Sequence, residues 1–293
     1  MGACCAPGRD EPAPQHRPVA GAAEPVDTSG FIRLDATEFT MGEGGPWAYP
    51  ADGEQPRAAA VASFAISPTA VTNAEFAAFV EATGYRTDAE HYGWSFVFGG
   101  LLPDDFPDTR GVAAAPWWRE VLGASWRCPE GPHSDIAERP DHPVVHVSWN
   151  DAEAYCAWRG VRLPTEAEWE FAARGGSTST FWWGDDLEPG GEHRMNVFQG
   201  DFPAVNSVAD GWLGTCPVTA FAPNQYGLYN TTGNVWEWTG STWDGANPSE
   251  QLVLKGGSYL CHASYCRRYR PAARMASTPD SSTGNIGFRC AVS

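Results

Sequence analysis

Lysine is almost absent from this 293-residue chain, because Lys255 is the only lysine among 19 basic Lys and Arg residues. Positive charge is scarce as well, and the formal net charge is −17. A protein that binds nucleic-acid phosphates needs a basic face, so the composition argues against a nucleic-acid partner. The preference for arginine over lysine is typical of GC-rich bacterial genomes.

Long apolar runs are also absent. No stretch of 18 apolar residues is present, so we expect no transmembrane helix and no membrane partner. Residues 1–30 contain no apolar stretch of the kind that a secretory signal has, and they are expected to form a disordered tail. Cys4 and Cys5 fall in this tail and are expected to be dispensable. Residues 31–293 are expected to form one domain in the bacterial cytoplasm, where cysteines are normally reduced.

The familiar cysteine motifs are missing too. The chain has 8 cysteines but no Cys-x-x-Cys and no His-rich zinc pattern. Cys261 and Cys266 are the only close pair in the predicted domain. A spacing of five puts two side chains on different faces of a helix of ~3.6 residues per turn, and on opposite faces of a strand. The two sulfurs can therefore meet only across a sharp bend, as in a disulfide, a soft-metal site or a redox catalyst.

Aromatic residues, glycine and proline are plentiful instead, with 13% aromatics, 32 Gly and 24 Pro. This mixture is typical of a loop-rich globular protein whose irregular segments are held by large side chains. Capping boxes followed by glycine stops predict three helices. The predicted helices begin at Thr72-x-x-Glu75, Asn150-x-x-Glu153 and Thr165-x-x-Glu168, and they end at Gly84, Gly160 and Gly175.

Short apolar runs between turn residues predict strands and loops. Phe31–Met41 is expected to form a strand and a turn, and Val61–Ile66 a strand. After Gly175, short strands and loops are expected at Val218–Phe221, Val235–Trp238, Leu252–Leu254 and Ile286–Val292. The stretch from Gly93 to Asp141 is rich in Pro, Gly and Trp and is expected to be irregular. We therefore predict a single α+β domain with little regular secondary structure.

Several motifs together resemble the formylglycine-generating enzyme (sulfatase-modifying factor) family, of the bacterial aerobic type, from about Phe31 to Cys290. These motifs are Leu163–Phe171, Tyr226–Asn230, Gly233–Trp238, Gly256–Tyr259 and Asn285–Cys290. The first four also mark iron-dependent thiol-histidine synthases and lectin-like binding modules, and the resemblance implies a fold of the C-type-lectin-like type. The segments Ser258–Arg270, Ala272–Arg274 and Thr278–Ser282 are similar to the catalytic segment of the true enzymes.

The resemblance implies a copper-dependent oxidase. Such an enzyme converts the cysteine of a Cys-x-Pro-x-Arg segment in an unfolded sulfatase to Cα-formylglycine, using O2 and a thiol reductant. Cys261 and Cys266 would hold Cu(I), a soft ion that prefers thiolate ligands, and the hydroxyls of Ser258 and Tyr265 would line the site. The protein is expected to be a monomer.

Two rival interpretations stay open beside this one. A non-catalytic peptide- or ligand-binding module of the same fold would carry Cys261–Cys266 as a structural disulfide. An iron oxygenase relative would need a histidine cluster, and the 7 histidines form no His-x3-His-x-Glu run.

Two sets of oxygen donors match the family's calcium sites. Calcium takes six to eight oxygen ligands, backbone carbonyls included, whereas the ordinary alternative is that Asn and Asp simply form turns. The first predicted set is Asn196 and Asp210 with the carbonyls of Val197 and Trp212. The second is Asn230 and Glu237 with the carbonyls of Gly233 and Val235.

Aromatic residues in the predicted irregular half suggest a groove for an extended peptide, although they could equally pin loops in the core. The predicted substrate-contacting residues are Ser95, Trp117, Trp118 and His262, which flanks the cysteine pair. The resemblance also pairs Cys156 with Cys290 as a disulfide in secretory relatives. A second family bridge is replaced here by Ala173 and Pro271, so two reduced thiols are the alternative.

Overall fold

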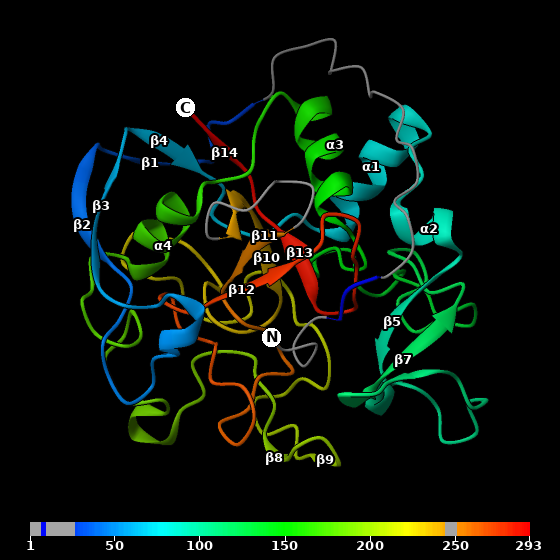
Figure 1. Cartoon of the computed structure of the whole chain (residues 1–293). Helices are drawn as coiled ribbons and strands as arrows, with labels where there is room; N and C mark the ends of the chain where they lie inside the picture. The colour runs from blue at the N-terminus through cyan, green and yellow to red at the C-terminus, as the bar shows by residue number, and fades with distance from the viewer. Residues whose placement is uncertain (1–6, 10–26, 244–250) are drawn as a thin grey trace.

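The computed structural model describes residues 7–9, 27–243 and 251–293. Its strands are short and are distributed over several small sheets, which are connected by long irregular segments (Figure 1). The predicted α+β class with little regular structure is confirmed. Most of the predicted tail, residues 1–30, lies outside the described residues, but its described part includes Arg9, which is packed against the domain with 6% of its surface exposed. No described helix is both long and apolar enough to span a bilayer.

A four-stranded sheet lies at the centre of the molecule, in the order β12-β11-β10-β13 (Figure 1). Strands β10 and β13 run parallel, and the other neighbours run antiparallel. Trp236 and Trp238 of β10 are fully buried, so this strand packs its largest side chains into the core. The strand bounds are β10 Trp236–Thr242, β11 Leu252–Lys255, β12 Arg274–Ser277 and β13 Ile286–Phe288.

Smaller sheets flank the central one on two sides. On the left of Figure 1 lie β1-β4-β14 and the β2-β3 hairpin, and on the right lies β5-β7-β6. Their strands are β1 Ile32–Leu34, β2 Thr37–Met41, β3 Arg57–Val61, β4 Phe64–Ile66, β5 Trp94–Phe98, β6 Gly111–Val112, β7 Ala115–Leu122 and β14 Ala291–Val292; β8 Gly200–Asp201 and β9 Val205–Asn206 form a further short hairpin.

The α-helices each begin with a capping box and end at a glycine in the left-handed conformation. The boxes satisfy backbone N–H groups that a helix N-terminus leaves unpaired. The helices are α1 Asn73–Thr83, α2 Asp88–Tyr92, α3 Trp149–Arg159 and α4 Glu166–Arg174, with short 3-10 turns η1 Pro50–Asp52, η2 Gly99–Leu101 and η3 Pro189–Gly191.

Two of the helix starts are predicted correctly and one is wrong. Helices α1 and α4 carry the predicted boxes, but α3 is capped by Ser148 with Asp151 at the third helical position, two residues before the predicted box. Helix α2, capped by Thr87 and Glu90, was not predicted. Among the segments predicted as short strands and loops, Val218–Phe221 forms turns.

The stretch from Gly93 to Asp141 is not wholly irregular, because β5 pairs with β7 along its full length. The five residues of β5 are all buried, so the strand lacks the alternation of polar and apolar residues that reveals a half-exposed strand. This sheet brings Trp117 and Trp118 into the part of the molecule that holds the paired cysteines.

The single lysine lies in the core. Lys255 is fully buried, and its Nζ lies 2.9 Å from Glu170 Oε2. Glu170 also accepts hydrogen bonds from Arg174 and from the backbone N–H of Gly42. Burial opposes ionisation, but the charges of Lys255 and Arg174 outweigh it and lower the pKa of Glu170. The single lysine therefore helps to neutralise the buried carboxylate of Glu170.

Candidate thiol site

The paired cysteines lie in the loop that follows β11. Gly256 and Gly257 begin this loop with positive φ angles of 96° and 75°. A Cβ on Gly257 would lie 2.6 Å from Tyr269 Cα, so a glycine is required where the two arms of the loop cross. The N–H of Cys261 then donates to the carbonyl of Ser258, and the N–H of Cys266 donates to that of His262. These two turns produce the predicted bend.

The bend brings the sulfurs of Cys261 and Cys266 to 3.6 Å. A disulfide bond would be about 2.05 Å long, so the two thiols are in contact but not bonded. Both residues are 1% exposed, and burial together with the neighbouring thiol raises the pKa of Cys261 well above its ordinary value. The N–H of Ser258 donates to Cys261 Sγ at 3.4 Å, and Arg268 Nη1 lies 3.9 Å from Cys266 Sγ.

Two thiols at this separation fit a soft metal ion. Sulfur ligands lie about 2.3 Å from a bound zinc ion, and two such ligands can be 3.6 Å apart. Among the described residues no group of three or more His, Cys, Asp or Glu side chains could hold a metal. The donor set among the described residues is therefore two sulfurs, which suits Cu(I) better than a four-coordinate structural zinc.

Ser258 is held in a fixed orientation beside the cysteines. Its side chain is buried, and its Oγ accepts hydrogen bonds from Asn285 Nδ2 at 2.9 Å and from the N–H of Leu260 at 3.3 Å. In both bonds Ser258 Oγ is the acceptor, so its hydroxyl proton can be donated to a substrate atom. Asn285 was not assigned a role from the sequence, although it begins one of the motifs that carry the resemblance.

Aromatic side chains surround Tyr265, the other predicted hydroxyl. Tyr265 stacks on Phe202 at a ring-centroid distance of 4.9 Å and meets Trp117 edge-on at 4.8 Å. His262 lies against the other rings, 6.5 Å from Phe202, and burial lowers its pKa. We call Trp117, Phe202, His262 and Tyr265 the aromatic mouth; all four are partly exposed. Nothing in the sequence pattern pointed to Phe202.

The other two predicted substrate residues are buried. Trp118 follows Trp117 in β7, points to the opposite face of the strand and is 0% exposed in the core. Its placement does not fit a substrate contact, and the ordinary alternative of a core aromatic holds for it. Ser95 is also buried, and its Oγ lies 3.0 Å from the carbonyl of Ser282 and 2.8 Å from His146 Nδ1.

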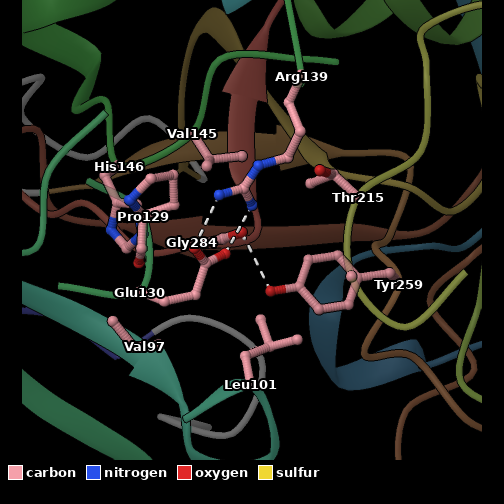
Figure 2. Close-up of a pocket in the computed structure, with 11 residues that line it drawn as sticks. Val97, Leu101, Pro129, Glu130, Arg139, Val145, His146, Thr215, Tyr259 and Gly284 are labelled. Carbon is pink, nitrogen blue, oxygen red and sulfur yellow. Dashed lines mark hydrogen bonds and ion pairs between the residues drawn. The ribbon is translucent and has the colours of Figure 1, made fainter. Parts of the chain in front are cut away.

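A cavity of about 130 Å³ is lined by His146, which contacts Ser95, and by Tyr259 of the loop that follows β11 (Figure 2). Its polar groups are paired with one another. Arg139 forms a two-pronged ion pair with Glu130 at 2.7 and 2.8 Å, and Tyr259 donates to the carbonyl of Gly284. His146 bonds Pro129 and Ser95 with its two ring nitrogens. The polar groups that line the cavity therefore have hydrogen-bond or ion-pair partners within the protein.

The first predicted calcium set is brought together by the structure. Asn196 is fully buried, and its Oδ1 has no hydrogen-bond donor. Asp210 accepts from the N–H groups of Val197 and Trp212, so all four predicted residues are near one another. Gln199 Nε2 donates to the carbonyl of Val197 and to Asp210 Oδ2, so the unpaired buried oxygen of Asn196 is the feature of this set that fits an oxygen-ligated cation.

The second predicted set has the same feature, because Asn230 Oδ1 is buried without a donor. Asn230 and Gly233 both have positive φ angles, which bends the chain there. Glu237 is 1% exposed and accepts three hydrogen bonds, two at Oε2 from Trp169 and Arg289 and one at Oε1 from Arg289. A carboxylate has about four acceptor positions, so one remains for a cation.

Cys156 and Cys290 form a second close pair, with sulfurs 4.0 Å apart. Cys156 lies on α3 and Cys290 follows β13, and both are buried and unbonded. The alternative of two reduced thiols, rather than a disulfide, describes this structure.

The fold and the site together define a loop-rich α+β domain with two converging thiols beneath an aromatic mouth. The chain belongs to the sulfatase-modifying factor family, since residues 17–293 match the model described as "Sulfatase-modifying factor enzyme 1-like domain". It is 55% identical to the formylglycine-generating enzyme of Streptomyces coelicolor, over 92% of this chain and 91% of the relative. It is 51% identical to that of Bos taurus, over 91% of this chain and 75% of the relative.

Other relatives qualify this likeness. The chain is 48% identical to a Bos taurus protein named "Inactive C-alpha-formylglycine-generating enzyme 2", over 90% of this chain and 88% of the relative. Among solved structures, PvdO from Pseudomonas aeruginosa matches with a TM-score of 0.65 and 27% identity, over 89% of this chain and 93% of that one. Overall identity alone therefore does not decide activity, and the site must carry that argument.

Proposed function

We propose that this chain is a copper-dependent oxidase that converts the cysteine of a Cys-x-Pro-x-Arg segment in unfolded sulfatases to Cα-formylglycine. The observation that carries the proposal is the pair of buried, unbonded sulfurs 3.6 Å apart beneath the aromatic mouth. Relatives about half identical to the chain carry the name formylglycine-generating enzyme. The family includes inactive members, so the thiol pair is what favours an enzyme here.

The overall reaction balances with O2 and a thiol reductant. One peptidyl cysteine, one O2 and two reductant thiols give one peptidyl aldehyde, one hydrogen sulfide, one disulfide and one water. The cysteine carbon is oxidised and O2 is reduced, while the reductant supplies the two further electrons. Cys261 and Cys266 would hold Cu(I), which supplies the one-electron chemistry with O2 that side chains lack.

The protein's own residues position the substrate and exclude water. Cys261, Cys266 and Ser258 are almost completely buried, so a substrate thiol would reach them through the aromatic mouth. The rings of Trp117 and Tyr265 would hold the peptide, and the hydroxyl proton of Ser258 would be donated to the reacting atoms. Fixed geometry of this kind lowers the entropic cost of bringing reactants together.

Two structural calcium ions and a reducing location complete the proposal. The unpaired oxygens of Asn196 and Asn230 support calcium at the two predicted sites. The unbonded sulfurs of Cys156 and Cys290 favour a reducing compartment such as the bacterial cytoplasm. The thiol loop and the mouth come from a single chain, which favours a monomer.

A synthetic peptide tests this function. A peptide with Cys-x-Pro-x-Arg, copper-loaded protein, O2 and dithiothreitol should lose about 18 Da and gain a hydrazine-reactive aldehyde. A peptide with Ser in place of Cys should not react, because serine supplies no thiolate. Aldehyde formation that continues without O2 would contradict the oxidase, and no aldehyde with copper bound would favour the non-catalytic binding module.

A further inference from the structure

The chain contains its own copy of the proposed client sequence. Residues 5–9 read Cys5-Ala6-Pro7-Gly8-Arg9, which matches Cys-x-Pro-x-Arg at all three fixed positions. Of the 8 cysteines, only Cys5 is followed by proline two residues later and arginine four residues later. The prediction that Cys5 is dispensable assigns no function to this match.

Arg9, the last residue of the match, is buried with 6% of its surface exposed and has several partners in the domain. Its Nη2 donates to the carbonyl of Trp94 at 2.8 Å and to Ser282 Oγ at 3.1 Å, and its backbone N–H donates to Ser281 Oγ at 2.9 Å. The guanidinium lies 4.3 Å and 4.0 Å from the ring centroids of Tyr92 and Trp94. Stacking on aromatic rings and directed hydrogen bonds are how proteins recognise a guanidinium.

This site is connected by packing to the aromatic mouth, which the proposed function assigns to the client. Trp94, on which Arg9 stacks, belongs to one apolar cluster with Phe202 and Trp117 of the mouth and with Leu260, the residue before Cys261. Ser282 Oγ is also 3.1 Å from the buried Ser95 Oγ, which the sequence predicts as a substrate contact. The Arg9 side chain is therefore packed against the same cluster as the loop that carries the thiol pair.

We propose that residues 5–9 are a built-in client segment and that the chain oxidises its own Cys5 to Cα-formylglycine. This inference rests on the proposed function. The step is the same one: the Cβ–S bond of Cys5 breaks, a C=O bond forms, and the sulfur leaves as hydrogen sulfide. O2 is the oxidant, and two thiols of an external reductant supply two electrons and become a disulfide.

The reaction is assigned to a single molecule. Cys5 is four residues from Arg9, and four residues span at most about 14 Å, so Cys5 is tethered to the molecule that holds Arg9. Tethering gives a reacting group a high effective concentration. The first-order rate constant for Cys5 oxidation should therefore not change with protein concentration, and a rate constant that rises in proportion to concentration would overturn the single-molecule assignment.

The experiment uses the full chain without an N-terminal tag, purified and then supplied with copper, O2 and dithiothreitol. Trypsin releases the peptide that ends at Arg9, and its mass should fall by about 18 Da with the change at position 5. Cys5→Ser should abolish this change. Cys4→Ala is the matched control and should leave it intact, because Cys4 has neither the proline nor the arginine spacing. Arg9→Lys keeps the charge and the cleavage point but loses the planar fork, and should slow the reaction about tenfold.

Further arms separate this inference from the function on which it rests. If a synthetic client peptide becomes an aldehyde while Cys5 stays a thiol, self-modification is overturned and the proposed function stands. If neither is oxidised, both fail. Oxidation of Cys5 in the Cys266→Ala variant would show that the paired thiols are not responsible, and would also overturn the inference.

Discussion

The two close cysteine pairs of this chain look alike by simple measures and differ in their surroundings. The sulfurs of Cys261 and Cys266 are 3.6 Å apart and those of Cys156 and Cys290 are 4.0 Å apart. Both pairs are almost completely buried, and burial raises the pKa of Cys156 as it does that of Cys261. Neither separation nor burial therefore identifies a reactive pair.

The neighbours of each pair make the distinction. All four cysteines belong to the main apolar cluster, in which Tyr155, next to Cys156 on α3, packs edge-on against Phe288 with ring centroids 5.3 Å apart. The pair in the loop differs because Arg268 and the N–H of Ser258 are directed at its sulfurs. Its Cys266 also follows directly on Tyr265, a partly exposed residue of the aromatic mouth. A buried thiol pair becomes a candidate site when polar groups are directed at its sulfurs and partly exposed residues adjoin it.

The largest effect is expected from breaking the loop pair. Cys261→Ala and Cys266→Ala should each lower aldehyde formation from a client peptide by about 1000-fold or more, because either change removes half of the metal-binding donor set. Copper binding, followed by titration, should be lost in parallel.

The core pair supplies the matched control. Cys156→Ala should keep turnover close to that of the unmodified chain and lower the free energy of unfolding by about 1–2 kcal/mol, because it leaves a small cavity. Loss of turnover in a folded Cys156→Ala protein would remove the distinction between the two pairs.

The adjacent tryptophans of β7 extend the same comparison from sulfur to aromatic side chains. Trp118→Ala should lower the free energy of unfolding by about 3–5 kcal/mol, since the side chain is fully buried. Trp117→Ala should lower it far less and should instead raise KM for the client peptide. Denaturant unfolding and steady-state kinetics measure the two effects, and a reversal of the pattern would contradict the placement of the mouth.

Sequence reasoning found the loop pair because a spacing of five forces a bend wherever two sulfurs meet. It also found α1 and α4, since a capping box and a glycine stop are local signals. It missed β5, whose five buried residues lack alternation, and it grouped Trp118 with Trp117 because neighbours in sequence take opposite faces only once a strand is known. Phe202 reaches the mouth by tertiary folding alone, and no local pattern reveals such a contact.

The unpaired oxygen of Asn230 sharpens the comparison between a structural site and a reactive one. Calcium at 100 times its Kd should raise the free energy of unfolding by about 2.7 kcal/mol, and a chelator should reverse this. Asn230→Ala should remove the part of the calcium response that comes from the second site, while leaving the first site and copper binding at the loop pair intact. Substitution of Glu237 would be a less specific test, because it would also leave the buried guanidinium of Arg289 without its carboxylate partner. An unmodified chain that shows no calcium response in thermal unfolding would contradict the site.

The last prediction concerns His146, whose Nδ1 lies 2.8 Å from Ser95 Oγ. Burial lowers the pKa of His146 to about 4 from an ordinary value of 6.5, against the opposing charge of Glu130 and with help from Arg9 and Arg139. The unfolded chain therefore takes up a proton between these two values that the folded chain refuses. The stability is fully present above pH 6.5 and falls as the pH drops toward 4. The free energy of unfolding should change by about 1.4 kcal/mol for each pH unit from this residue alone.

Urea unfolding of His146→Gln across the same pH range should show a slope that is shallower by this amount, with the exposed His133→Gln as the matched control. Equal slopes in all three proteins would mean that His146 is protonated in the folded state. The imidazole that contacts Ser95 and lines the cavity would then carry a positive charge.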